Sequence, residues 1–451
     1  MNDTIAAIST TLGVGAISII RVSGSDAIKI VNSIFKGKDL EKVESHTISY
    51  GHIKDGDNLL DEVLVSVMKS PKTFTTEDIV EINCHGGIAT TNKVLEAVLK
   101  NGARLAEPGE FTKRAFLNGR IDLTQAEAVM DLINVKSDTA RQIAINNLKG
   151  NTTKKIRNLR EKLSDILANI EVNIDYPEYQ DIEEMTVGKI KDELDNIKDE
   201  LDKIIENSKN SKIIKDGINV AIIGRPNVGK SSILNMFSGY NKAIVTDIAG
   251  TTRDIVEESI ILDGIGLNLI DTAGIRQTKD IVEQIGVERS KQAIEKADLV
   301  LLVLNNNEQL QKEDKELLEL SKNKKRIIII NKNDLEKKID INELKQEEIV
   351  TTNTLNDDGI KELKEKIKEM FNLDKIETKD YNYVSNINQL RKVEEAKNSI
   401  ENIRQNIENN LPIDIIEIDL KYIWDVLGEV IGETYQEELL DNLFSKFCVG
   451  K

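Results

Sequence analysis

The spacing of apolar residues changes along the chain, and each change predicts a different kind of structure. Residues 1–120 alternate short β-rich runs, at 16–22 and 62–68, with helical stretches, which indicates an α+β fold. From about residue 122 to residue 214 the apolar residues recur every three or four positions, which predicts long amphipathic helices. The two apolar stripes consist of Ile156, Leu159, Leu163, Ile166, Ile170 and Ile174, and of Ile190, Leu194, Ile197, Leu201 and Ile204.

A third pattern, in which strands and helices alternate, occupies residues 217–374. Four short runs of branched apolar residues in this region are typical of parallel strands that are buried on both faces. They are 218–223, 267–270, 299–304 and 326–330. Helical periodicity then returns from Leu390 onward. Since neither helical segment can bury its apolar stripe alone, we expect an α/β domain inserted into a helical domain; the alternative is four consecutive domains.

Composition narrows the classes of function that this chain can have. Its 61 Lys and Arg against 78 Asp and Glu give a net charge of −17, and residues 1–120 are nearly neutral. Such an acidic chain is unsuited to coating nucleic acid without regard to sequence. Two cysteines and no CxxC pair exclude a disulfide framework and a cysteine zinc site. Because neither a secretory leader nor an apolar run of membrane-spanning length is visible, we expect a cytoplasmic protein.

One segment carries the chemistry of nucleotide binding. Residues 224–231 read Gly-Arg-Pro-Asn-Val-Gly-Lys-Ser and fit the phosphate-loop pattern GxxxxGK[ST] directly after the run 218–223. Glycines in such a loop let backbone N–H groups surround phosphate oxygens, and the helix that follows adds its positive end. We expect Lys230 to reach the β- and γ-phosphates of a nucleotide and Ser231 to ligate Mg²⁺.

Two further motifs follow predicted strands and point to guanine. Residues 271–274, Asp-Thr-Ala-Gly, close the run 267–270 and place a carboxylate near the Mg²⁺ shell. Residues 331–334, Asn-Lys-Asn-Asp, close the run 326–330. Asp334 can accept two hydrogen bonds from guanine that adenine cannot offer, so the site favours GTP. The usual Ser-Ala turn beside the base is poorly matched by residues 350–354, which predicts a weakened or rearranged base edge.

The expected hydrolytic machinery departs from that of Ras-like enzymes. Thr252 is the expected switch threonine, but Ile275 occupies the place of the glutamine that orients water, and only Arg253 and Arg276 are candidates for an arginine finger. Asp280 or Glu283 could orient the attacking water instead. Asn227 could help to seat a monovalent cation between the phosphates; the alternative is that these are solvated loop residues.

Together these patterns predict a multidomain α/β chain. The predicted domains are an N-terminal α+β domain at 1–120, a helical bundle domain in two parts at 121–214 and 376–451, and an inserted Ras-like P-loop GTPase domain at 215–375. The residues expected to contact GTP are Asn227, Val228, Gly229, Lys230, Ser231, Ser232, Thr246, Asp247, Ile248, Ala249, Gly250, Thr251, Thr252, Asp271, Thr272, Ala273, Gly274, Asn331, Lys332, Asn333 and Asp334.

From end to end, the sequence resembles the MnmE (TrmE) family of tRNA modification GTPases. Besides the phosphate loop, the matching blocks are 3–5, 21–24, 81–87, 108–112, 114–119, 174–178, 247–254 and 447–451. The resemblance implies a homodimeric, K⁺-dependent GTPase whose two G domains meet across the nucleotides. It also implies a FAD-dependent partner protein (MnmG, or GidA, in this family). With that partner the dimer would form a heterotetramer or larger assembly that adds a (carboxymethyl)aminomethyl group to carbon 5 of wobble uridine in tRNA.

The resemblance also assigns roles to single residues. It implies that Glu283, rather than Asp280, positions the attacking water, and that Cys448 has a role in tRNA modification. With Lys230 and Thr252, these are the predicted catalytic residues. The metal ligands would be Ser231 and Thr252 for Mg²⁺, and Asn227, Thr246, Ile248 and Thr251 for K⁺. The N-terminal domain resembles folate-binding, dimerising domains. It would hold a tetrahydrofolate derivative (5,10-methylene or 5-formyl form) through Arg21, Glu81, Arg120 and Lys451.

Two other functions use the same motifs. A stand-alone regulatory or ribosome-assembly GTPase would share the G domain but would bind no folate and need no partner. A one-carbon transferase with a vestigial G domain would have no need of intact motif residues such as Lys230, Asp271 and Asp334. Their presence argues against the transferase.

Overall fold

We analysed a computed structural model of the chain. It describes residues 3–135, 137–175, 187–240, 258–262, 265–270, 283–344, 347–353, 358–371, 381–409, 413–434, 440, 443–445, 447 and 449–450. The chain divides into two compact units. The first unit comprises Met1–Met130, Leu148–Lys198 and Arg391–Lys451, and the second comprises Asp131–Asn147 and Asp199–Leu390.

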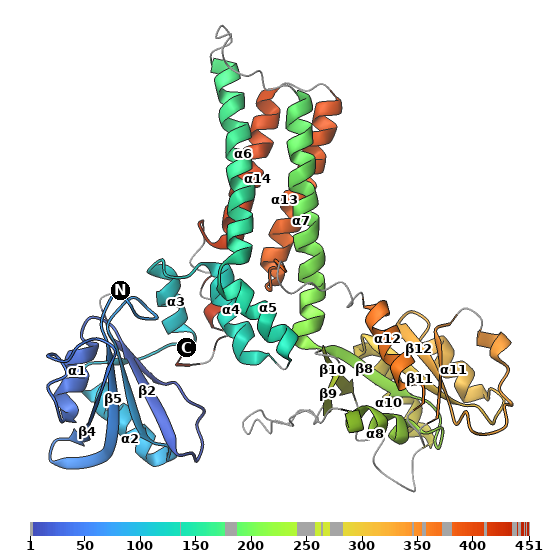
Figure 1. The fold of residues 1–451 in the computed structure, drawn as a ribbon, viewed down its shortest axis with the longest axis horizontal. Coiled ribbons are helices and arrows are strands. Elements are labelled where there is room, and N and C mark those ends of the chain that lie inside the picture. The colour runs from blue at the N-terminus through green and yellow to red at the C-terminus, as the bar shows by residue number, and fades with distance from the viewer. Residues whose placement is uncertain are drawn as a thin grey trace. The chain divides into compact units, whose positions relative to one another are not determined.

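Among the described residues of the first unit, a seven-stranded sheet, drawn in blue in Figure 1, has the order β3-β4-β5-β6-β2-β1-β7. The strands are β1 Ile5–Ile8, β2 Ile17–Ser23, β3 Phe35–Lys36, β4 Thr47–Asp55, β5 Asn58–Met68, β6 Ile79–His85 and β7 Arg104–Leu105. Helices α1 (Ala27–Ile34) and α2 (Ile88–Lys100) bury their apolar sides against one face of this sheet. Phe111 of α3 (Glu110–Leu117) packs on the other face with Ile5 and Ala7. This arrangement confirms the α+β fold predicted for the N-terminal region.

A buried ionic network fixes α3 to the start of the chain. The guanidinium group of Arg114 is almost fully buried and bonds the carboxylates of Glu110 at 3.0 Å, Asp3 at 2.8 Å and Glu77 at 3.1 Å. Arg104 donates to the same Glu110 carboxylate at 2.7 Å. Each buried charge therefore has an opposite partner, which is the condition under which charges are tolerated in a core.

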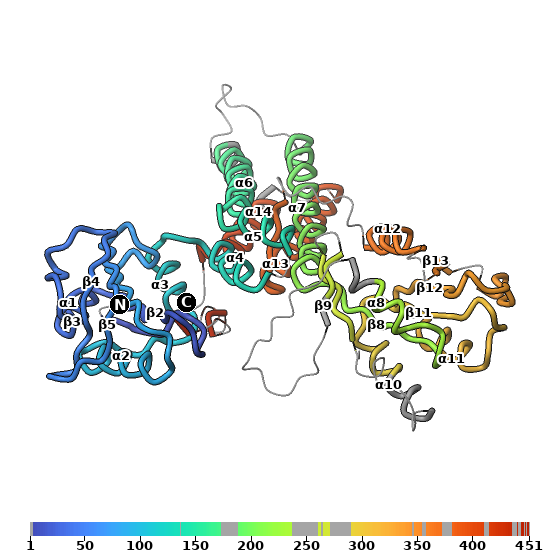
Figure 2. The backbone as a smooth tube through the Cα atoms, turned by 60° about the horizontal axis from the view of Figure 1, so that its bottom comes forward, coloured from blue at the N-terminus to red at the C-terminus, as the bar shows by residue number. Residues whose placement is uncertain are grey.

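Long helices form the rest of the first unit. Helix α6 (Asn151–Asp175) packs against α14 (Ile413–Ile431), and α13 (Ile387–Glu408) lies beside the first half of α7 (Val187–Asp216) (Figure 1, Figure 2). The predicted apolar stripe of α6 is buried from Ile156 to Ile170, as is that of α7 from Ile190 to Ile204. No helix in the part of the chain that the structure describes has both the length and the apolar character of a membrane span.

Among the described residues of the second unit, a six-stranded sheet has the order β13-β12-β11-β8-β10-β9. The strands are β8 Ile218–Ile223, β9 Glu258–Leu262, β10 Ile265–Ile270, β11 Leu299–Asn305, β12 Lys325–Asn331 and β13 Ile349–Thr352. All neighbours run parallel except β9, which is antiparallel to β10. Alternate residues of β8 face opposite sides, so that Val220 joins one core and Ala221 the other.

Helices cover both faces of this second sheet. Helices α8 (Lys230–Tyr240) and α12 (Ile360–Met370) pack on one face, and α10 (Glu283–Lys296) and α11 (Lys312–Leu320) pack on the other. A short 3₁₀ helix, η1, spans Ile341–Leu344. The parallel sheet with a phosphate-loop turn after β8 confirms the predicted P-loop GTPase fold class.

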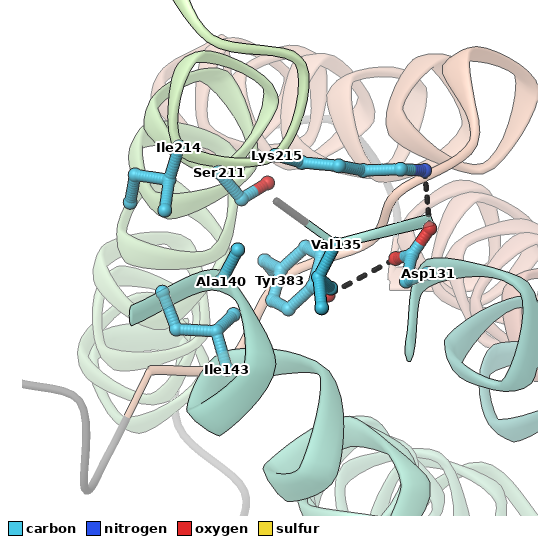
Figure 3. A pocket seen from close by; sticks show the side chains of 8 residues that line it. All are labelled: Asp131, Val135, Ala140, Ile143, Ser211, Ile214, Lys215 and Tyr383. Carbon is cyan, nitrogen blue, oxygen red and sulfur yellow. Dashed lines mark hydrogen bonds and ion pairs between the residues drawn. The ribbon is translucent and has the colours of Figure 1, made fainter. Parts of the chain in front are cut away.

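The segments that lead into and out of this sheet meet at one buried carboxylate. Asp131, in helix α4 (Leu123–Asn134), pairs with Lys215 of α7 and accepts a hydrogen bond of 3.1 Å from the hydroxyl of Tyr383. Figure 3 shows these side chains lining a small cavity with Val135, Ala140, Ile143, Ser211 and Ile214. Buried Asn147 of α5 (Asp138–Leu148) donates to the Tyr383 carbonyl oxygen at 3.1 Å. The incoming and returning chain are thus tied to each other through α4 and α5.

Candidate functional site

The phosphate loop connects the end of β8 to the start of α8 and depends on two glycines. Gly224 has a φ of +148° and Gly229 a φ of +106°, a region that side chains other than glycine disfavour. A Cβ atom on Gly224 would lie 2.4 Å from the carbonyl oxygen of Val303. A Cβ atom on Gly229 would lie 2.1 Å from Nδ2 of Asn331. The loop therefore fits closely against the ends of two neighbouring strands.

Lys230 is held inside this loop by backbone oxygens. Its Nζ atom donates to the carbonyl oxygens of Gly224 at 2.6 Å and Arg225 at 2.7 Å, and burial lowers the pKa of this ammonium group. Ser231 and Ser232 follow in the exposed first turn of α8, where the positive end of the helix dipole favours an anion. A partly buried lysine beside a helix N-terminus fits a polyphosphate. The Ser231 hydroxyl, at the same turn, suits a phosphate-bound Mg²⁺.

The predicted guanine motif lies directly against the phosphate loop. Buried Asn331, the last residue of β12, donates from Nδ2 to the carbonyl oxygen of Val228 at 3.0 Å and accepts from Thr352 Oγ1 at 3.1 Å. Lys332 has a φ of +63°, and its Nζ atom donates to the carbonyl oxygen of Asn227 at 2.9 Å. Asn333 and Asp334 are exposed. The structure thus brings the two motifs together and leaves the Asp334 carboxylate accessible.

Sequence reasoning missed two contributors to this site. Thr352 belongs to the segment that we predicted to match the base turn poorly, yet its hydroxyl holds Asn331. Arg225 received no role, but its side chain bonds Asp314 and Glu308. The local sequence pattern near these partners is the capping pair of Gln311 and Asp314 at the start of α11. Such a pattern predicts where a helix begins, but it does not predict a contact with the phosphate loop.

Many predicted site residues lie outside the described residues. They are Thr246, Asp247, Ile248, Ala249, Gly250, Thr251, Thr252, Arg253, Asp271, Thr272, Ala273, Gly274, Ile275, Arg276, Asp280, Cys448 and Lys451. Glu283 is the first residue of α10, but its side chain also lies outside the description. Their assigned roles stay predictions.

The N-terminal unit brings together two of the predicted folate residues. Arg21 of β2 and Glu81 of β6 are register partners, and Arg21 Nε donates to Glu81 Oε1 at 2.9 Å, with about a quarter of each side chain exposed (25% and 24%). Arg21 also donates to the carbonyl oxygen of Gly450 at 3.1 Å, as does the hydroxyl of Ser9 at 3.1 Å. The tail that leads to Lys451 is therefore fixed beside Arg21.

Arg120 reaches the same region through aromatic rings. Its guanidinium group lies 5.2 Å from the ring centre of Phe74, and that of Arg21 lies 5.7 Å from the ring centre of Phe111. Phe74 packs against the small core that contains Phe111, so two cations flank one aromatic cluster. Guanidinium groups bind carboxylates and stack on flat rings, which fits a ligand that carries both.

Comparison with known proteins covers the whole chain. Residues 4–120 match the family model described as GTP-binding protein TrmE N-terminus, and residues 123–448 match the one described as MnmE helical domain. A tRNA modification GTPase MnmE from Ligilactobacillus salivarius is 53% identical over 455 residues, covering 100% of this chain and 98% of that protein. One from Bacillus cytotoxicus is 55% identical over 455 residues, covering 100% and 99%. Among solved structures, the G domain of the T. maritima FeoB iron transporter is 31% identical, covers 34% of this chain and 98% of its own, and has a TM-score of 0.25.

Proposed function

Since the chain belongs to the MnmE family of tRNA modification GTPases, we propose that it hydrolyses GTP at residues 224–231 and that this hydrolysis serves the modification of tRNA. The observation that carries the proposal is the contact between the two nucleotide motifs. Asn331 of the guanine motif holds the carbonyl of Val228, while Lys230 is held inside the loop. A direct hydrogen bond therefore joins the loop that would hold the phosphates to the motif that would bind the base.

The nucleotide roles follow from this arrangement and from the family. Lys230 would contact the β- and γ-phosphates, and Asp334 would accept hydrogen bonds from the guanine edge. Ser231 and Thr252 would hold Mg²⁺, which supplies positive charge opposite the phosphate oxygens. Exposed Asn227, with Thr246, Ile248 and Thr251, would hold K⁺ where other GTPases place an arginine. Glu283 would orient the attacking water in place of the missing glutamine.

Turnover measurements test the hydrolytic part of this proposal. GTP hydrolysis by the full chain should be faster in K⁺ than in Na⁺ at equal ionic strength, and equal rates would refute the K⁺ role of Asn227. Glu283→Ala should lose turnover at unchanged GTP affinity. Asp280→Ala is the matched control, since it removes a nearby carboxylate; loss of turnover in this variant alone would refute the assignment of Glu283.

For the N-terminal unit we propose a tetrahydrofolate site at Arg21, Glu81, Arg120 and Lys451. The paired Arg21 and Glu81, the docked Gly450 carbonyl and the cations beside Phe74 support it. Titration with 5-formyltetrahydrofolate should show at least tenfold weaker binding to Arg21→Ala, an effect of about 1.4 kcal/mol that one charged hydrogen bond can supply. Lys93→Ala is the control, because it removes an exposed cation from α2 that pairs only with Glu96 among the described contacts. Equal binding by both variants would refute the site.

The assembly proposed here is a homodimer that works with a FAD-dependent partner in the cytoplasm on wobble uridine at carbon 5. Its domains would be the four segments predicted from the sequence, with the G domain at 215–375. Nucleoside analysis of tRNA from cells that lack this protein is the direct test. Unchanged wobble uridines alongside intact GTP turnover would instead favour a regulatory or ribosome-assembly GTPase.

A further inference from the structure

Arg225, the second residue of the phosphate loop, bonds two different parts of the G domain. Its backbone carbonyl oxygen accepts a hydrogen bond of 2.7 Å from Lys230 Nζ. Its side chain points to α11, where Nε lies 2.9 Å from both carboxylate oxygens of Asp314. The Asp314 side chain is 2% exposed and that of Arg225 18%, so this ion pair is largely shielded from water. One residue thus connects the ammonium group of Lys230 to a buried carboxylate on another element.

Asp314 is itself fixed in place by the start of its helix. It is the third residue of α11 and forms a reciprocal capping pair with Gln311, whose backbone N–H donates to Asp314 Oδ2 at 3.0 Å. Burial alone would lower the pKa of Arg225, but its bonds to Asp314 and Glu308 outweigh burial and raise that pKa. The guanidinium group therefore stays charged at every physiological pH and cannot leave its buried partner without a large cost.

Glu308 extends the connection toward the guanine motif. Its Oε2 atom accepts from Arg225 Nη2 at 2.8 Å, and its Oε1 atom accepts from the side chain of Asn305, the last residue of β11, at 2.6 Å. The next residue, Asn306, donates its backbone N–H to the carbonyl oxygen of Asn331 at 2.9 Å. The same short segment between β11 and α11 therefore holds both the phosphate loop and the end of the guanine strand.

We propose that Arg225 acts, through Asp314 and Glu308, as a positioning residue for GTP. This clamp, formed by Arg225, Asp314 and Glu308, sets the location of the Lys230 ammonium group relative to the guanine motif before any nucleotide binds. This inference rests on the proposed function, since it concerns the same GTP site. A purely structural ion pair would affect only the stability of the domain, whereas a positioning residue must also change nucleotide affinity in protein that is folded.

The test compares nucleotide affinity among matched variants of the full chain, with a fluorescent GDP and a non-hydrolysable GTP analogue as probes. Arg225→Ala should weaken both nucleotides by roughly 10- to 100-fold, the order expected when a misplaced group must be reoriented by its ligand. Arg225→Lys should restore little, because an ammonium group cannot replace the planar fork of a guanidinium. Asp314→Asn, which keeps the size of the side chain, should weaken binding in the same direction.

Arg326→Ala is the control for stability. Arg326 of β12 forms a partly buried ion pair with Glu347 and contacts α11 near its other end, at the carbonyl oxygen of Leu318. This variant should lower the unfolding temperature and leave nucleotide affinity unchanged. If Arg225→Ala does not fold, the nucleotide affinity of Asp314→Asn is compared with that of Arg326→Ala instead.

Coupling between the two residues gives the decisive result. If Arg225 acts through Asp314, the double variant should bind GDP no more weakly than Arg225→Ala alone. Additive losses, or wild-type affinity in folded Arg225→Ala, would overturn the inference while leaving GTP binding by the unaltered chain intact. Failure of the unaltered chain to bind GTP would overturn the proposed function as well, so the two failures are distinguishable.

Discussion

Replacing Gly229 with alanine would drive the phosphate loop and the guanine strand apart. The new Cβ atom would lie 2.1 Å from Nδ2 of Asn331, far inside van der Waals contact. The φ of +106° alone costs an alanine about 1–3 kcal/mol. Moving the buried Asn331 amide breaks its bonds to Val228 and Thr352, and an unsatisfied buried polar group costs about 1–3 kcal/mol more. The sum is about 2–6 kcal/mol, so even the lower limit corresponds to a roughly 30-fold change in an equilibrium constant.

Titration with fluorescent GDP measures the part of this free-energy cost that weakens nucleotide binding. Thermal unfolding of the same samples measures the part that destabilises the fold. Gly229→Ala should show weaker GDP binding, a lower unfolding temperature of the G domain, or both. Gly56→Ala is the control for backbone strain, because Gly56 has a φ of +60° and a Cβ atom added there would meet nothing within 4 Å. A Gly229→Ala protein with unchanged GDP affinity and unchanged unfolding temperature would refute the close fit between loop and strand.

Three further predictions concern other parts of the chain. Gly450→Ala should free the tail from the N-terminal sheet, because its Cβ atom would lie 2.3 Å from the carbonyl oxygen of Ile8. We expect faster amide hydrogen exchange at residues 443–450 and normal GTP turnover, and unchanged exchange would contradict this prediction. Glu110→Gln should destabilise the N-terminal unit by about 1–3 kcal/mol at neutral pH, since Arg104 and Arg114 each lose a charged hydrogen-bond acceptor while both keep Asp3. Burial raises the pKa of Glu110, but bonds from both arginines outweigh burial and hold that pKa below its usual 4.5. The stability that ionised Glu110 contributes is therefore present above pH 4.5 and is lost as pH falls through the lowered value. Acid should consequently lower the unfolding temperature of the wild type more steeply than that of the variant. Tyr383→Phe should cost about 1 kcal/mol in thermal unfolding, because its hydroxyl bonds buried Asp131, and a change in GDP affinity instead would show that the connecting segments influence the nucleotide site.

Periodicity predicted the elements whose burial is regular. The stripes of α6 and α7 and the runs that became β8, β11 and β12 were recognisable because each buries a fixed face or both faces along its length. Strands β9 and β13 were not predicted, since they lie at the sheet edges and are short and partly polar. The phosphate loop and guanine motif were found because their residues are contiguous. The Arg225–Asp314 clamp was not, because its partners are 89 positions apart and no local pattern joins them.

The contact between Arg21 and Gly450 can form only at the end of synthesis of the chain. The two residues are 429 positions apart, which a ribosome adding about 5–20 residues per second covers in about 20–90 s. The strands around Arg21 are all made within the first quarter of the chain and can pair long before Gly450 exists. During that interval the nascent domain can fold, but it lacks the tail carbonyl oxygen that accepts a hydrogen bond from Arg21. A ribosome that stops early would therefore release a chain that can form the N-terminal sheet but lacks the tail beside Arg21.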